Sequence, residues 1–178
     1  SLLSERRLLF GENATEAQLP AVARRVALIV ANDAYNDPAY PALATPLADG
    51  QAVAELLVEK FGYATKLDMG DGKQRDLFLH NATKADIQKV LFDLRKRLTA
   101  DDQLIVYYAG HGEIDDEETA YWVPVDAAKP FNYLSGVTLT EHIQRILARS
   151  VILISDSCYA GALRSGGEAG CAASRACG

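Results

Sequence analysis

Residues 103–112 read Gln-Leu-Ile-Val-Tyr-Tyr-Ala-Gly-His-Gly, and this stretch decides the fold. Its apolar part is rich in β-branched and aromatic residues without polar alternation, which is typical of a strand buried on both faces of a parallel sheet. Residues 26–31 and 151–155 have the same character. The sequence therefore predicts three buried strands, and the glycines beside the histidine mark the point where one of them ends.

Helical segments separate these strands. Residues 47–61 and 84–98 place apolar side chains at helical spacing. Thr83 and Asp86 have the spacing of a capping box, and a Thr–Glu pair at 138–141 repeats it before a third helix. Strands that alternate with helices predict right-handed crossovers and an α/β fold, in which helices cover both faces of a mostly parallel sheet.

The rest of the chain is assigned around this core. Residues 63–67 are predicted as another strand, and 121–125 as a short hairpin or edge strand because of its proline. Residues 1–24 read as a loosely attached N-terminal arm, and 164–178, rich in Gly, Ala, Ser and Cys, as a flexible linker. The folded domain is expected to span residues 25–163.

Composition excludes several classes of function. The chain has 178 residues and a formal net charge of −6, which argues against nucleic-acid binding and favours cationic partners. Its longest apolar runs have six residues, against about 20 for a membrane span. Three cysteines show neither a disulfide pattern nor metal-ligand spacing. We expect no metal, no membrane partner and a cytoplasmic location; because the sequence does not begin with Met, a removed leader is the alternative.

The candidate chemistry lies where two buried strands end. His111 follows one of these strands and Cys158 follows the other. Because the carboxyl ends of parallel strands meet at one edge of the sheet, the two side chains are expected on neighbouring strands. An imidazole beside a thiol can remove its proton and later protonate a leaving amine. The Gly112 amide, together with that of Cys158, could bind an oxyanion.

Each residue alone has a simpler interpretation. Gly-His-Gly at a strand end is more often a turn, and a cysteine after an apolar strand is more often a small buried hydrophobe. Their joint placement favours catalysis over both. The cysteine follows the histidine by 47 residues, close to the separation of about 50 found in caspases.

Three motifs then resemble one family. Residues 107–112 (YYAGHG), 121–126 (YWVPVD) and 156–161 (DSCYAG) are similar to motifs of caspase-fold cysteine peptidases, in family order. More narrowly they resemble the metacaspase-like, or orthocaspase, branch of bacteria. The resemblance implies a three-layer α-β-α sandwich, with Cys158 as nucleophile, His111 as general acid and base, and Gly112 in the oxyanion hole.

The resemblance also implies a substrate preference. It places Asp156, two residues before the cysteine, in the primary specificity pocket, where a carboxylate favours Arg or Lys and repels Asp. The resemblance also places Asp49 in this pocket, through the family's Asn-Asp-Ala segment. This match is less close, because Ala-Asp-Gly stands here in its place. The alternatives are a carboxylate that stabilises a helix N-terminus for Asp49 and a structural hydrogen-bond acceptor for Asp156.

Further expectations concern processing and calcium. The family fold continues past the cysteine with a small subunit, so this chain is interpreted as the large-subunit portion, with Arg164 and Arg175 as candidate self-cleavage sites. No cofactor is expected to be required. The acidic run at 115–118 could bind activating Ca²⁺, but it lacks the alternating ligand spacing of a dedicated site and is better interpreted as a solvated loop.

Two other functions are consistent with the motifs. One is a catalytically silent caspase-fold module that recruits partners. The other is a related His/Cys peptidase of different specificity, such as a legumain-like or separase-like enzyme. The sequence favours a cysteine endopeptidase that acts on polypeptides after Arg or Lys.

Overall fold

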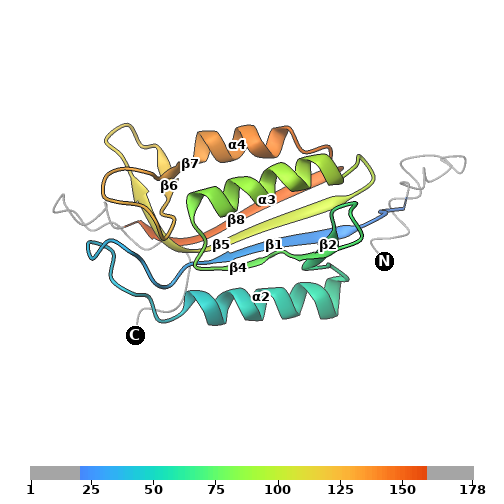
Figure 1. Ribbon diagram of the computed structural model, residues 1–178, viewed down its shortest axis with the longest axis horizontal. Coiled ribbons are helices and arrows are strands. Elements are labelled where there is room, and N and C mark those ends of the chain that lie inside the picture. The colour runs from blue at the N-terminus through green and yellow to red at the C-terminus, as the bar shows by residue number, and fades with distance from the viewer. Residues whose placement is uncertain (1–20, 160–178) are drawn as a thin grey trace, which may run out of the picture.

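Four parallel strands form the centre of the structure, a computed structural model that describes residues 21–159 (Figure 1). Their order is β4, β1, β5 and β8, and each neighbouring pair is parallel. Two short strands, β6 and β7, extend the far end of β5 in antiparallel order. The bounds are β1 Arg25–Ala31, β4 Phe78–His80, β5 Gln103–Ile114, β6 Ala120–Trp122, β7 Leu134–Ser135 and β8 Ser150–Tyr159.

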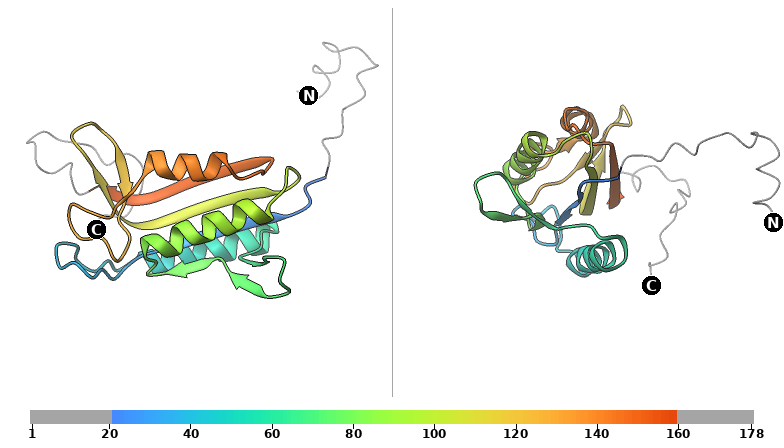
Figure 2. Two further views of the ribbon diagram at one scale, coloured as in Figure 1. Left: turned by 45° about the horizontal axis from the view of Figure 1, so that its top comes forward. Right: turned by 90° about the vertical axis from the view of Figure 1, so that its right-hand side faces the viewer.

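Helices cover both faces of this sheet. Helix α2 (Pro46–Phe61) lies on one face, and α3 (Lys84–Arg97) and α4 (Gly136–Gln144) lie on the other (Figures 1 and 2). Because successive strand residues point to opposite faces, β1 and β5 each contribute to two cores. The core under α3 and α4 contains Val26, Leu28, Val30, Leu104, Val106 and Tyr108. The core under α2 contains Ala27, Ile29, Ile105, Tyr107 and Ala109. The predicted α/β sandwich with a mainly parallel sheet is confirmed.

Of the two predicted helix N-caps, the structure confirms one. Both hydrogen bonds of the predicted capping box form between Thr83 and Asp86 at the start of α3. The predicted cap at 138–141 is wrong, because α4 begins earlier and its N-cap is Ser135, whose side-chain oxygen accepts from the Thr138 N–H. Ser135 has the extended backbone that is typical of an N-cap.

Two strands are longer than the sequence predicts. The sequence places Gly-His-Gly after a strand, but β5 continues to Ile114 and His111 lies inside it. Likewise β8 continues through Cys158 to Tyr159. The reason is pairing: β8 pairs with β5 as far as Gly112, and β6 pairs with it from Gly112 to Ile114, so the strand stays extended through both glycines.

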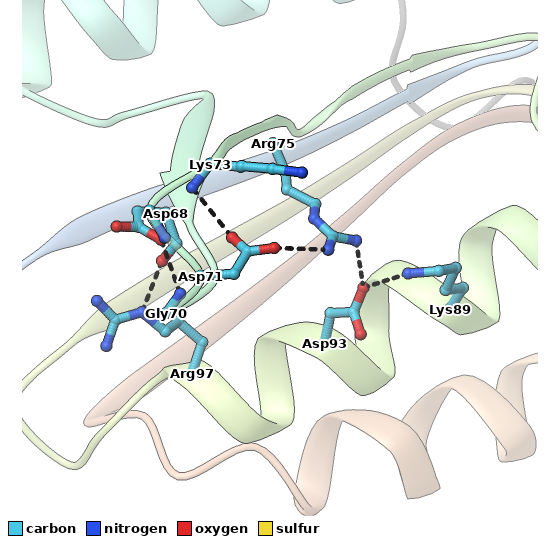
Figure 3. A network of polar contacts seen from close by, with 9 residues as sticks. Asp68, Gly70, Asp71, Lys73, Arg75, Lys89, Asp93 and Arg97 are labelled. Carbon is cyan, nitrogen blue, oxygen red and sulfur yellow. Dashed lines mark hydrogen bonds and ion pairs between the residues drawn. The ribbon is translucent and has the colours of Figure 1, made fainter.

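Two shorter segments also differ from expectation. The sequence predicts a strand at 63–67, but the regular strand is β2 (Lys66–Asp68), which pairs with β3 (Gln74–Asp76) in a separate antiparallel pair. Figure 3 shows how this pair is tied to α3, since Arg75 lies within ion-pair distance of both Asp71 and Asp93. Of the segment 121–125, predicted as a hairpin or edge strand, only 121 and 122 belong to a strand, β6, which lies between β5 and β7.

Some expectations fall on other parts of the chain. Of the predicted arm at 1–24 only 21–24 are described, and the predicted linker at 164–178, with Arg164 and Arg175, lies outside the described residues. Within 21–159, no helix is long and apolar enough to cross a membrane.

Candidate active site

The candidate catalytic residues lie side by side in the sheet. In the parallel ladder between β5 and β8, His111 is the direct partner of Cys158. Neighbouring strands are about 4.8 Å apart, so the two backbones are adjacent although 47 residues separate them in sequence. The expectation that they lie on neighbouring strands at one end of the sheet is confirmed. Gly112, the next residue, pairs with Trp122 of β6 and with Tyr159 of β8.

The imidazole of His111 is buried and held at one nitrogen. Its exposed fraction is 8%, and its Nε2 lies 2.8 Å from the carbonyl oxygen of Pro41. A carbonyl oxygen can only accept, so Nε2 carries the proton in this contact and Nδ1 is the basic nitrogen of the neutral ring. The backbone N–H of His111 donates to the hydroxyl of Tyr35 at 2.8 Å.

Aromatic side chains surround the same histidine. The rings of Tyr35 and Tyr40 lie 4.8 and 5.4 Å from the His111 ring, centroid to centroid. The Tyr108 hydroxyl donates to the His111 carbonyl at 2.7 Å. A Cβ at Gly110 would lie 2.7 Å from the hydroxyl oxygens of both Tyr35 and Tyr108. Glycine is therefore required before the histidine, because two phenol oxygens occupy the space of a side chain.

The two candidate specificity carboxylates, Asp156 and Asp49, both raise the pKa of one tyrosine, Tyr107. Asp156 is exposed on β8 and accepts a hydrogen bond from the hydroxyl of Tyr107 at 3.2 Å. Asp49 lies in the first turn of α2. Burial raises the pKa of Tyr107, and the negative charges of Asp156 and Asp49 raise it further. Among the described residues, neither carboxylate forms an ion pair.

The structural alternatives for these residues also have support. Asp49 occupies a first-turn position where a carboxylate stabilises a helix, and Asp156 is a hydrogen-bond acceptor near a strand end.

In the acidic loop, Asp115 accepts from the N–H groups of Glu117 and Thr119, which is typical of a solvated turn. Within residues 21–159 no group of three or more His, Cys, Asp or Glu side chains is placed to hold a metal ion.

Sequence reasoning missed the residues that hold the histidine. Tyr35, Tyr40 and Pro41 lie in the loop after β1, which has no periodic pattern, and a backbone carbonyl acceptor leaves no signature in a sequence. Tyr107 is the first residue of the motif at 107–112, but its place in an apolar run predicts only a core residue. The sequence also shows no partner for His80, yet its Nε2 lies 3.0 Å from a carboxylate oxygen of Asp33.

Comparison with known proteins identifies the class. A family model described as the caspase domain matches residues 24–175, so the chain belongs to the caspase-domain family. The family consists of cysteine peptidases and also includes inactive members. A search of the curated proteins finds no match.

A solved structure supports the fold. The chain is similar to protein GSU0716 from Geobacter sulfurreducens, with a TM-score of 0.60 and 23% sequence identity over 78% of this chain. The match covers 52% of that protein, so this chain spans about half of its length. At this level of identity the similarity concerns the fold alone.

Proposed function

We propose that this chain carries the catalytic centre of a cysteine endopeptidase that cleaves polypeptides after Arg or Lys. The observation that supports it best is the direct pairing of His111 with Cys158 in adjacent strands, with Nε2 of the histidine committed to the Pro41 carbonyl. This leaves Nδ1 as the nitrogen that can exchange a proton with a thiol.

The proposed reaction has two halves. Nδ1 of His111 takes the proton of the Cys158 thiol, and the thiolate sulfur attacks the carbonyl carbon of the scissile bond. The C–N bond then breaks, the imidazolium gives its proton to the leaving amine, and a thioester remains. Water attacks the thioester while His111 takes a proton from it, and cleavage of the C–S bond releases the acid and returns the proton to the sulfur. The Gly112 amide is proposed to stabilise the oxyanion in both halves, which requires its N–H to leave the ladder with β8.

The preference for basic residues rests on the carboxylates. Burial raises the pKa of Tyr107, and the negative charges of Asp156 and Asp49 both raise it further. Neither carboxylate has a cationic partner among the described residues. A substrate guanidinium or ammonium group would supply that missing charge, whereas a substrate Asp would add a third carboxylate. We propose the bacterial orthocaspase branch because the motifs at 107–112, 121–126 and 156–161 resemble it, and we propose that a small-subunit segment completes the sheet beyond β8.

The test is hydrolysis of matched fluorogenic peptides that differ only in the residue before the scissile bond: Arg, Lys, Asp or Asn. We expect the full-length protein to cleave the Arg and Lys peptides and Cys158→Ala to cleave none. Cys171→Ala is the control and should retain activity. Preference for Asp would contradict the pocket assignment, and activity that survives in Cys158→Ala would exclude the proposed nucleophile. Absence of cleavage, with and without Ca²⁺, would favour a silent interaction module.

Self-processing is a separate part of the proposal. Under basic specificity, Arg164 and Arg175 are the proposed self-cleavage sites. Peptide mapping of the full-length wild type and of Cys158→Ala should show cuts after one or both arginines in the wild type only. Identical maps without these cuts would refute it.

A further inference from the structure

A buried carboxylate lies close to the histidine and has no part in the proposed reaction. Glu113 is on β5, two residues after His111, and its exposed fraction is 9%. Its Oε1 accepts a hydrogen bond from the Tyr40 hydroxyl at 3.1 Å and lies 3.4 Å from Nζ of Lys129. Burying a carboxylate is costly unless such partners compensate it, so the bond to Tyr40 is part of what keeps Glu113 in place.

Tyr40 connects this carboxylate to the catalytic histidine. Its ring packs 5.4 Å from the imidazole, and the residue that follows it, Pro41, supplies the carbonyl that accepts from His111 Nε2. The bond to Glu113 therefore fastens the loop after β1 to the same strand that carries His111. The hydroxyl of Tyr133 also contacts the Tyr40 hydroxyl, so two groups fix its position.

The ionisation of Tyr40 is consistent with this arrangement. Burial raises its pKa, and the neighbouring Tyr133 and Glu113 raise it further. The hydroxyl therefore stays protonated and can donate to Glu113 throughout the working range of a peptidase.

We infer that Tyr40, anchored by Glu113, is a positioning residue that holds the Pro41 carbonyl against His111 Nε2 and so keeps Nδ1 free for proton transfer. The inference rests on the proposed function of His111, although the tautomer it predicts can be measured without turnover. Tyr40 acts through the histidine and is not itself placed in contact with substrate.

The kinetic test compares three substitutions. Tyr40→Phe keeps the ring and removes the hydroxyl, and we expect kcat on an Arg peptide to fall about tenfold while KM stays within about twofold, because proton transfer is impaired and substrate binding is not. Glu113→Gln keeps an acceptor and should stay within about threefold of the wild-type kcat, whereas Glu113→Ala should resemble Tyr40→Phe.

A matched control is available on the same protein. The hydroxyl of Tyr121 also donates to a carboxylate, that of Asp115, at 2.7 Å, but this carboxylate lies in the exposed loop after β5. Tyr121→Phe should leave kcat unchanged. An equal loss in Tyr121→Phe, or a kcat for Tyr40→Phe equal to that of the wild type, would overturn the inference.

The second readout is the tautomer of His111, measured from the ring ¹⁵N shifts of the full-length protein with labelled histidine and assigned by the signals that disappear in His111→Gln. We expect the Nε2–H form in the wild type and a mixture of both tautomers in Tyr40→Phe. An unchanged tautomer in Tyr40→Phe would contradict the inference. This readout needs no peptidase activity, so failure of the inference can be told apart from failure of the proposed function.

Discussion

The ladder between β1 and β5 runs from Gln103 to Ala109 of β5, and the carboxylates beside its two ends are in opposite situations. Asp102, directly before the strand, is fully buried and accepts from Arg24 Nε and Nη2 at 2.9 and 2.6 Å and from the Thr99 N–H at 2.7 Å. Asp156 of β8 pairs with Ala109, at the other end of this ladder; it is exposed and accepts from the Tyr107 hydroxyl. The first charge is compensated within the chain and contributes to stability. The second lacks an ion-pair partner within residues 21–159 and can receive a cationic ligand.

The largest effect is expected on peptidase activity, from a substitution of the uncompensated carboxylate, Asp156. Asp156→Asn keeps the size of the side chain and removes its charge, so we expect kcat/KM for an Arg peptide to fall about 100-fold or more, since a bound guanidinium would lose its counter-ion. The melting temperature should change little. A variant that keeps wild-type kcat/KM would show that Asp156 has a structural role.

The next effect is at the compensated end. Asp102→Ala removes the acceptor of the Thr99 N–H and leaves the Arg24 guanidinium only the Arg97 carbonyl among the described residues, so we expect the free energy of unfolding to fall by about 2–4 kcal/mol. Urea unfolding measures this change. Asp101→Ala is the control, because Asp101 is exposed and lies 3.9 Å from Arg149, and it should cost less than about 1 kcal/mol. Equal losses in the two variants would contradict the contrast between the ends.

A smaller effect is expected from the tyrosine that holds the specificity carboxylate. Tyr107→Phe removes the hydroxyl that donates to Asp156, so the carboxylate is less well positioned for a cationic side chain. We expect KM for the Arg peptide to rise about three- to tenfold while kcat changes little. A fall in kcat at constant KM would instead place Tyr107 with the proton-transfer residues.

The smallest effect concerns pH. The hydrogen bonds from Arg24 hold the pKa of Asp102 below its ordinary value. A lowered folded-state pKa contributes stability above the unfolded pKa of about 3.9, and this contribution is lost as the pH falls through the folded value. The difference in unfolding free energy between wild type and Asp102→Asn should therefore shrink from about pH 6 to about pH 3. A constant difference would contradict the assignment.

Much of the framework could be predicted from the sequence because its signals are periodic. The buried strands and the two long helices follow from apolar runs and helical spacing, and the meeting of His111 with Cys158 follows from the geometry of a parallel sheet. The capping box at Thr83 could be recognised because its partner side chain is only three residues away.

The remaining features depend on tertiary contacts. Strands β3 and β4 have three residues each and are too short to show a period. The glycines at 110 and 112 indicate a turn locally, but pairing with β6 and β8 keeps the strand extended. The groups that position His111 come from a loop about 70 residues earlier in the sequence, and one of them is a backbone carbonyl.

The central claim is that Cys158 is the nucleophile, and covalent labelling tests it most directly. The full-length protein would be treated with a peptidyl acyloxymethyl ketone that ends in Arg, and intact mass and peptide mapping would locate the adduct. We predict one adduct per chain, on Cys158, with much slower labelling in His111→Ala. Equal labelling of Cys171 or Cys177, or no adduct on Cys158, would contradict the account.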